Sequence, residues 1–216
     1  MDYQVVFESS FCVEFADEYK NGNGPRLLPD DPYLRAQTRL KVDWVNKKLC
    51  SPYYKVLVRT DWDERRAGFA ELLAALKVFS AELDAGGLLS AKPPVAAAEE
   101  EEEEAGHLRR QEKGRGPFWH GPDLGAVDVA LAPWAVRYHA LEHYRGPAFR
   151  LPLEDPELAG YARWLDATTS HPSVAPTIPD KQRYLDHVSK YADGSAKSKV
   201  GDAVRSGRPA HELAIN

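Results

Sequence analysis

The stretch that decides the fold is residues 125–141, GAVDVALAPWAVRYHAL, which has the clearest helical pattern in the chain. Pro133 lacks the N–H that would bond the carbonyl of Val129, so we expect the helix to bend there. Apolar side chains recur every three or four residues, the spacing that places them on one helical face. They are Val127, Ala130, Leu131, Trp134, Tyr138 and Leu141. The stretch therefore predicts a buried central helix.

Two residues are expected to organise the start of that helix. Asp128 comes three residues after Gly125, the spacing of a capping box, in which the carboxylate accepts the N–H of the N-cap residue. Gly125 offers no side-chain acceptor in return, which should cost only a few tenths of a kcal/mol relative to serine. We therefore predict a structural capping role for Gly125 and Asp128.

Most of the remaining chain also has helical patterns. An acidic residue, often followed by proline, marks the start of several segments, as the positive end of a helix dipole favours. The predicted helices cover residues 9–19, a segment from Asp30 that is interrupted or kinked at Pro52, a segment from Asp61 to Gly86, residues 155–171 and residues 180–191. The tail from Asp193 is polar and predicts at most a turn or two of helix.

Residues 3–7, YQVVF, are the exception, because they predict a single β-strand. A lone strand cannot satisfy its own backbone groups, and the sequence offers no second strand to pair with it. We therefore expect the chain to begin in the middle of an α/β domain and to continue as a mainly α structure.

Composition excludes several classes of protein. Of the 216 residues 43% are hydrophobic, enough for a substantial core, and the net charge of −5 disfavours nucleic-acid binding. Two cysteines cannot make a disulfide scaffold or a cysteine-rich metal site. No apolar run approaches the ~18 residues of a membrane helix, and the first residues do not resemble a signal peptide. We therefore expect a cytoplasmic protein with no membrane contact.

Residues 91–116 differ from the rest of the chain. They contain two adjacent prolines and six consecutive glutamates, with no aromatic residue. Such a segment buries too little apolar surface to offset its ordering entropy. We interpret it as a disordered acidic insert. Binding of a basic partner by the glutamates is a weaker alternative.

Three segments together resemble the glutathione transferase family, most closely its omega-like, fungal-type branch. Residues 8–19 (ESSFCVEFADEY) are similar to the end of that family's thioredoxin-like domain, and residues 26–32 (RLLPDDP) to its interdomain linker. Residues 125–134 (GAVDVALAPW) are similar to the signature of the central helix, where Gly125 replaces the usual serine or threonine. The matches occur in the family's order and cover most of residues 3–192.

The resemblance implies a fold and a division of the chain. The expected fold is mainly α, a glutathione-transferase C-terminal helical bundle preceded by a strand–helix remnant of a thioredoxin-like domain. The expected parts are residues 1–25 as the remnant, 26–192 as the helical domain with its insert at 91–116, and 193–216 as a polar tail.

The resemblance also implies an activity and a co-substrate. A member of the family would conjugate glutathione to small electrophiles or exchange it with mixed disulfides, with glutathione as co-substrate and no permanently bound cofactor. No residue matches the family's catalytic cysteine, serine or tyrosine, so we expect a truncated chain that is weak or inactive as written. The alternative is a non-catalytic helical module for protein interaction. Because members of the family usually form homodimers, the resemblance also implies a homodimer.

Glu8 and Ser9 are the candidate glutathione-binding residues. They stand where a strand meets a helix, and the first N–H groups of a helix suit an anion. By resemblance, Ser9 would bind the α-carboxylate of the γ-glutamyl group and Glu8 its ammonium. The alternative is that Ser9 only caps the helix and that Glu8 is solvated.

Aromatic residues of the helical domain are candidates for a hydrophobic co-substrate pocket, with ordinary helix–helix core as the alternative. The candidates are Trp44, Tyr54, Trp134 and Tyr138, with Tyr53 and Arg137 beside them. Cys12 and Cys50 are interpreted as packed apolar residues rather than nucleophiles. His139 and His143 could share a metal, but no third ligand is apparent, so no metal site is predicted.

Overall fold

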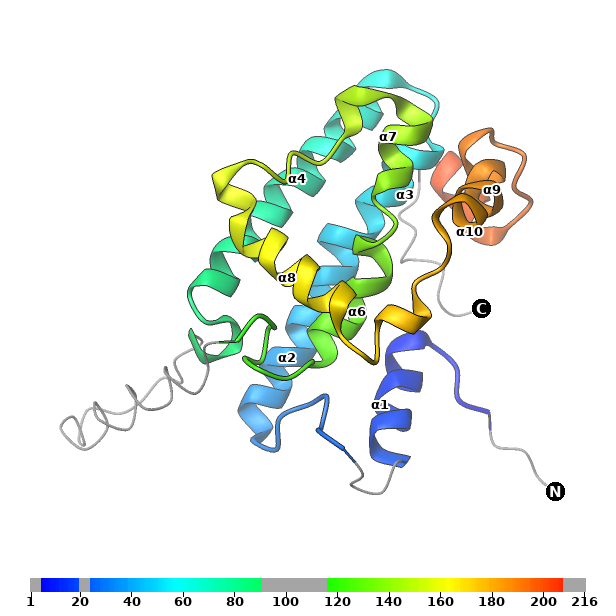
Figure 1. The fold of residues 1–216 in the computed structure, drawn as a ribbon. Coiled ribbons are helices and arrows are strands. Elements are labelled where there is room, and N and C mark those ends of the chain that lie inside the picture. Colours follow the sequence, from blue (N-terminus) through cyan, green and yellow to red (C-terminus); the bar gives the residue numbers. More distant parts are fainter. Residues whose placement is uncertain (1–4, 20–23, 91–115, 208–216) are drawn as a thin grey trace.

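The computed structural model describes residues 5–19, 24–90 and 116–207, and these residues form a helical bundle (Figure 1). Within these ranges there is no β-strand, only one isolated bridge between Phe118 and Gly121. The α-helices are α1 (Ser9–Tyr19), α2 (Pro32–Val45), α3 (Ser51–Val58), α4 (Trp62–Asp84), α6 (Ala126–Ala135), α7 (His139–Arg145), α8 (Ala159–Ser170), α9 (Lys181–Ala192) and α10 (Lys199–Arg205). The mainly α prediction is confirmed for these residues.

Helices α2 and α3 form one long rod joined by a π-helical turn, Asn46–Cys50. Asp31 caps the start of α2, because its carboxylate accepts the N–H of Leu34 at 2.8 Å. The predicted interruption falls where expected, since the π-turn immediately precedes Pro52 and a π-turn accommodates an irregular hydrogen-bond pattern. Val45, Leu49 and Val56 of the rod are fully buried.

Helix α4 runs beside this rod and packs on both α3 and α8 (Figure 1). The Asp61 carboxylate accepts the N–H of Glu64 at 2.8 Å and so caps its start. Its predicted apolar face is buried at Phe69, Leu72, Leu76 and Phe79. The helix ends at Gly86 and Gly87, which both have positive φ, a conformation that costs glycine little.

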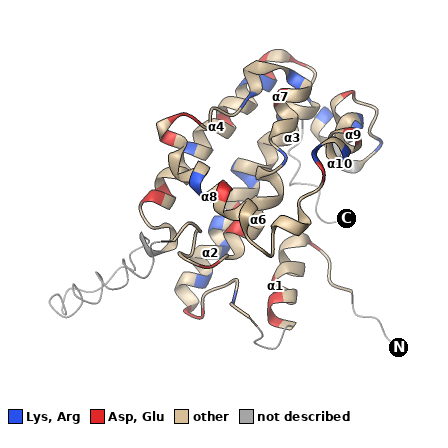
Figure 2. Cartoon of the chain, in the orientation of Figure 1, with Lys and Arg blue, Asp and Glu red and all other residues tan. Residues whose placement is uncertain are grey.

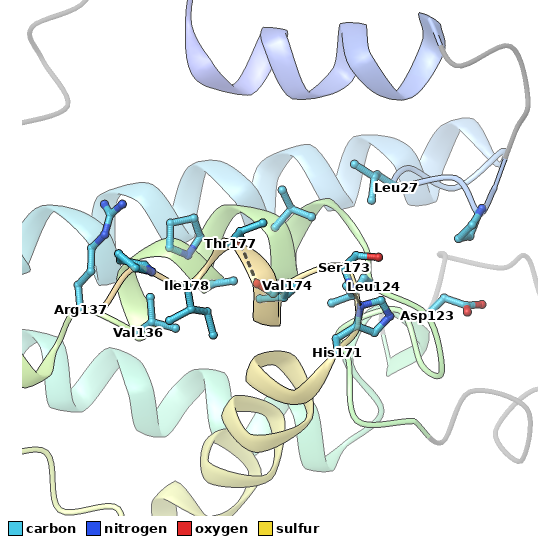
Figure 3. Close-up of a pocket in the computed structure, with 15 residues that line it drawn as sticks. Leu27, Asp123, Leu124, Val136, Arg137, His171, Ser173, Val174, Thr177 and Ile178 are labelled. Atoms are coloured by element: carbon cyan, nitrogen blue, oxygen red, sulfur yellow. Dashed lines mark hydrogen bonds between the residues drawn. The ribbon is translucent and has the colours of Figure 1, made fainter. Parts of the chain in front are cut away.

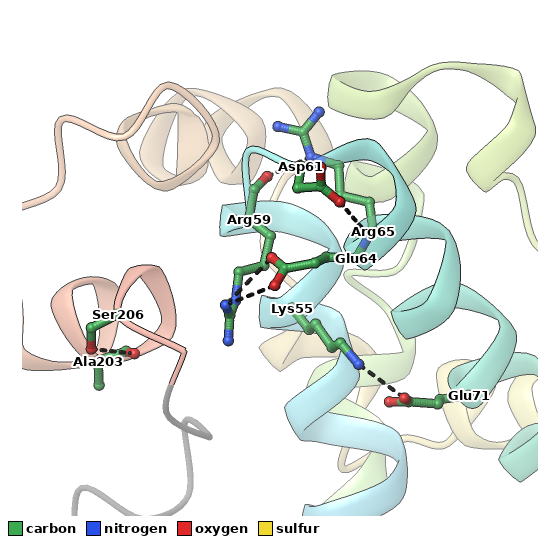
Figure 4. A network of polar contacts seen from close by, with 8 residues as sticks. All are labelled: Lys55, Arg59, Asp61, Glu64, Arg65, Glu71, Ala203 and Ser206. Carbon is green, nitrogen blue, oxygen red and sulfur yellow. Dashed lines mark hydrogen bonds and ion pairs between the residues drawn. The ribbon is translucent and has the colours of Figure 1, made fainter.

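Polar contacts at the outer ends of α3 and α4 tie the two helices together (Figure 4). Lys55 of α3 pairs with Glu71 of α4 at 2.9 Å, and Arg59 contacts Glu64 at 3.4 Å. Basic and acidic residues are interspersed along α2, α4 and α9, whereas α1 and α6 carry acidic residues without Lys or Arg (Figure 2). Exposed pairs of this kind contribute at most about 1 kcal/mol each, so the buried apolar contacts hold the bundle together.

The central helix is shorter than the sequence predicts. The prediction of one bent helix over residues 125–141 is wrong, because α6 ends at Ala135 and α7 begins at His139, with a turn over residues 136–138. Pro133 weakens the hydrogen-bond ladder just before the break. Tyr138 then turns inward, fully buried, and its hydroxyl donates to the carbonyl of Leu49 at 3.0 Å. The break leaves Arg137 on the turn.

The last helices follow the sequence prediction closely. Asp155 caps a 3₁₀ turn (Pro156–Leu158) that leads into α8, and Asp180 caps α9 by accepting the N–H of Arg183 at 2.8 Å. Trp164 and Tyr161 of α8 are fully buried in the core. Helix α10, seven residues long, lies in the polar tail and agrees with the one or two turns of helix expected there.

The N-terminal segment differs from its prediction. The strand expected over residues 3–7 is wrong where the structure describes it, since Val5, Val6 and Phe7 form no strand and Phe7 is 70% exposed. The described residues contain no strand with which they could pair. Helix α1 itself covers the predicted residues. It is attached through Glu14, which pairs with Arg39 of α2 at 2.6 Å.

The remaining predictions on the organisation of the chain are only partly covered. The insert predicted at 91–116 lies outside the described residues apart from Gly116. Among the described helices, none combines the length and the apolar character that crossing a bilayer requires.

Candidate functional site

Two cavities meet at the turn between α6 and α7. The first, of about 490 Å³, lies between Leu27, α6 and the loop that follows α8, and its walls are mostly apolar (Figure 3). The second, of about 350 Å³, lies between Tyr54 of α3 and helix α9. Arg137 and Pro179 line both cavities, so the break in the central helix places Arg137 at their junction.

An aromatic wall borders the second cavity. The ring of Tyr54 meets Trp134 edge to face at 5.3 Å and lies 6.2 Å from Tyr191. The ring centre of Tyr53 lies 5.8 Å from that of Trp134. The Tyr53 hydroxyl lies 2.7 Å from the Tyr184 hydroxyl. Such a wall presents apolar area with a few polar groups, as small-molecule sites do.

Arg137 brings a positive charge to this wall. Its guanidinium carbon lies 5.3 Å from the ring centre of Tyr184 and 5.9 Å from that of Trp134. Within the described part of the chain, its Nε is buried without a hydrogen-bond partner, and no carboxylate forms an ion pair with it. The guanidinium is therefore held by aromatic rings rather than by an acid.

The structure brings together only two of the four predicted pocket residues. Tyr54 lines the second cavity, and Trp134 packs edge to face behind it without lining either cavity. Trp44 instead lies beneath Lys41, whose ammonium nitrogen is 3.5 Å from its ring centre, and it lines neither cavity. Tyr138 is a core residue that also lines neither cavity. The alternative of ordinary core therefore holds for Tyr138.

Helix α9 supplies the part of the site that sequence reasoning missed. The sequence predicts a helix over residues 180–191, which runs through Tyr184, Val188 and Tyr191, without assigning these side chains to a site. In the structure Tyr184 and Tyr191 are only partly buried and face the second cavity, with Arg183 and His187 beside them. Two tyrosines and two basic residues on adjacent turns were the available signal.

Glu8 and Ser9 lie away from both cavities. Ser9 is the first residue of α1, and Glu8 has a positive φ of 69°, which is strained for a residue with a side chain. Both side chains are exposed, and the Glu8 carbonyl accepts the N–H of Cys12 at 2.9 Å. The first turn of α1 therefore consists of exposed residues, and the first N–H groups of a helix have no partner within the helix.

The remaining candidates, a cysteine and a histidine, are held in contacts that do not form a reactive or metal-binding site. Cys50 is buried, and burial raises the pKa of its thiol, which disfavours a thiolate. His139 Nδ1 lies 2.9 Å from the carbonyl oxygen of Val136. In the described residues no three metal-ligating side chains gather at one place.

Asp128 organises the start of α6. It is fully buried, and its carboxylate accepts three N–H groups, from Gly125 at 2.8 Å, Trp119 at 3.0 Å and the indole of Trp164 at 2.7 Å. Burial raises the pKa of this carboxyl to about 6, although the three donors act in the opposite direction. The predicted contact with Gly125 is thus one of three.

His120 fills the space in front of Gly125. A Cβ added to Gly125 would lie 1.6 Å from His120 Nδ1, so this position admits only glycine while the histidine stays in place. The other ring nitrogen lies 3.1 Å from the hydroxyl of buried Thr38. Burial lowers the pKa of His120 to about 4, so the ring is neutral near pH 7.

His120 should make the stability pH-dependent. Its folded pKa lies below its ordinary value of 6.5, so the unfolded chain binds the extra proton and stability falls as the pH drops from about 6.5 to 4. The free energy of unfolding of the parent should fall between pH 7 and pH 4 by about 1–2 kcal/mol more than that of a His120→Gln variant. This figure allows for the partial exposure of the ring. Urea unfolding at both pH values measures this. A difference that does not change with pH would contradict it.

The chain is similar in sequence to plant glutathione transferases. Glutathione S-transferase U19 of Arabidopsis thaliana is 29% identical over 185 residues, which cover 86% of this chain and 68% of the relative. The probable glutathione S-transferase parC of Nicotiana tabacum is 27% identical over 85% of this chain and 66% of its own length. The chain thus spans about two thirds of the length of these relatives. No protein-family model matches it.

Solved structures show the same fold. A tau-class glutathione S-transferase from mango (Mangifera indica) has a TM-score of 0.65 at 18% identity, over 87% of this chain and 71% of that one. Omega 3C from Trametes versicolor has a TM-score of 0.63 at 23% identity, over 89% and 67%. A rice enzyme in complex with glutathione has a TM-score of 0.62 at 23% identity, over 88% and 72%. Sequence and fold together support the glutathione transferase family, without singling out its omega class.

Proposed function

We propose that this protein is a glutathione transferase that conjugates glutathione to small electrophiles or exchanges it with mixed disulfides. The observation that carries the proposal is the aromatic cavity between α3 and α9, lined by Tyr54, Tyr184 and Tyr191, on a glutathione-transferase-like helical bundle. Glutathione is the co-substrate in this proposal. A neighbour of the same fold is described in complex with glutathione, which supports that choice.

The proposed division of labour assigns two regions to the two substrates. Tyr54, supported by Trp134 packed behind it, forms the apolar wall for the electrophile. Glu8 and Ser9 bind the γ-glutamyl end of glutathione, Ser9 through its hydroxyl and the N–H groups of the first turn. Gly125 and Asp128 act structurally, by fixing the helix that carries Trp134.

Several finer assignments belong to the same proposal. The omega-like character, the boundaries at residues 25 and 192 and a cytoplasmic location remain predictions from the sequence. None of the 216 residues matches the catalytic cysteine, serine or tyrosine of the family, so this chain by itself is expected to turn over substrate weakly or not at all. Binding is therefore the more direct test.

Retention on immobilised glutathione tests the proposal. We expect the chain to be retained and to elute with free glutathione, and we expect Ser9→Ala to weaken retention. Ser10→Ala is the matched control, because Ser10 is an exposed neighbour on the same helix. Passage of the parent chain through the column without delay would contradict the proposal.

A second function is favoured by one surface of α1. Three apolar side chains lie at four-residue spacing along α1, a fourth lies just before the helix, and all four are half or more exposed, which is unusual for apolar residues so near to one another. They are Phe7 (70%), Phe11 (63%), Phe15 (50%) and Tyr19 (73%). This stripe suits a non-catalytic interaction module or a homodimer.

Sedimentation analysis distinguishes these readings. If the stripe joins two copies, the parent chain sediments as a dimer and Phe11→Ser as a monomer. A stable complex with a protein partner in a chain that does not bind glutathione would favour the non-catalytic module. A monomer that retains glutathione binding would favour the enzyme alone.

A further inference from the structure

The second cavity carries an excess of positive charge over its aromatic walls. Arg137 and Arg183 line it together with a single carboxylate, Asp180, and the imidazole of His187 is a further polar group. That carboxylate already accepts the backbone N–H of Arg183 at 2.8 Å, as the cap of α9. In the described residues around this cavity, no acid is therefore placed against Arg137.

A partly buried guanidinium without a counter-ion is costly. Ionic groups removed from water are normally paired or fully hydrogen-bonded, and an isolated one loses several kcal/mol of solvation. The contacts of Arg137 with the faces of Trp134 and Tyr184, at 5.9 and 5.3 Å, offset only part of this loss. Its buried Nε still has one N–H to donate.

The neighbouring phenols can assist the guanidinium. Burial raises the pKa of Tyr53, Tyr54 and Tyr184, so all three hydroxyls stay protonated near pH 7. A protonated phenol is a hydrogen-bond donor and carries no charge that would repel an anion. Their rings at the same time offer flat apolar surface to an aromatic ligand.

We infer that the second cavity binds an aromatic carboxylate or sulfonate, with Arg137 paired to the anionic group and the ring against Tyr54 and Tyr191. The cavity volume of about 350 Å³ falls in the range of small-molecule sites, roughly 300–1,000 Å³. If the protein acts as proposed above, its electrophile would be an aromatic anion, and this assignment of the electrophile rests on the proposed function. Binding of the anion itself needs no glutathione.

Three naphthalene compounds that differ only in charge test the inference. These are 1-naphthoate, 1-naphthalenemethanol and 1-naphthylmethylammonium, each titrated by calorimetry into the full 216-residue chain without glutathione. We expect the anion to bind about tenfold or more tightly than the neutral compound, the gain typical of one charge-assisted contact, and the cation to bind most weakly.

Arginine variants locate the anion. Arg137→Gln should weaken naphthoate binding about tenfold and leave the neutral compound within about twofold. Arg183→Gln, at the rim, should have a smaller effect in the same direction. Arg150→Gln is the matched control, since Arg150 lies outside both cavities and pairs with Glu154 on the surface. Thermal unfolding of each variant verifies that it folds.

Two outcomes would overturn the inference. One is equal affinity of the parent chain for the three compounds, a result that does not depend on any variant. The other is unchanged naphthoate binding by a folded Arg137→Gln chain. Naphthoate binding by a chain that is not retained on glutathione would contradict the proposed function but support the anion site. Retention on glutathione by a chain that binds the three compounds equally would support the proposed function but contradict the anion site.

Discussion

Replacement of Asp128 by alanine is expected to lower the free energy of unfolding by about 3 kcal/mol. Three N–H donors lose their acceptor in a fully buried place, at about 2 kcal/mol each. Burial of the carboxyl is itself costly, as its raised pKa of about 6 indicates, so removal of the carboxyl offsets part of that loss. The donors outweigh the desolvation, so the net effect is destabilising.

Thermal and urea unfolding measure this effect. For a chain of this size the melting temperature should fall by roughly 6–12 °C. Asp123→Ala is the matched control, because Asp123 is an exposed carboxylate close by in the sequence and should change stability by less than about 0.5 kcal/mol. An Asp128→Ala chain that melts with the parent would contradict the three-donor arrangement.

Replacement of Gly125 by serine is expected to destabilise the protein by about 2–3 kcal/mol. Capping preferences alone predict the opposite sign, a gain of a few tenths of a kcal/mol. The reason for the reversal is His120, whose Nδ1 lies 1.6 Å from where the new Cβ would be. The ring would have to leave its position against the Thr38 hydroxyl.

A double variant isolates the cause. In the His120→Ala background the space in front of Gly125 is open, so Gly125→Ser should cost less than about 0.5 kcal/mol and could restore the N-cap hydrogen bond. A double-mutant cycle therefore predicts strong coupling between the two positions. If serine is equally destabilising with and without His120, the steric account is wrong.

Local sequence chemistry was sufficient to predict the helices. Asp31, Asp61 and Asp180 each cap a helix where the sequence indicated a start, because a carboxylate and the first N–H groups are neighbours along the chain. The buried face of α4 followed from its spacing in the same way. These features depend on contacts within a few residues.

Features that depend on contacts across the fold were not predictable. The break before His139 depends on Tyr138 reaching the carbonyl of Leu49, far away in the sequence. Trp44 and Tyr54 have the same apolar character, yet Lys41 covers one and the cavity borders the other. The charge of the candidate site was also hidden, since Arg183 and His187 join Arg137 only once α9 is packed.

The most direct test of the account is a nuclear magnetic resonance titration of the five tryptophan indole N–H groups with S-benzylglutathione. Trp134→Phe assigns the signal of the indole that packs against the cavity residues Tyr54 and Arg137, and Trp62, which packs on Phe149 away from these residues, is the internal control. The account predicts a saturable shift of the Trp134 signal with Trp62 unmoved. A Trp134 signal that stays in place at a large excess of ligand would contradict it.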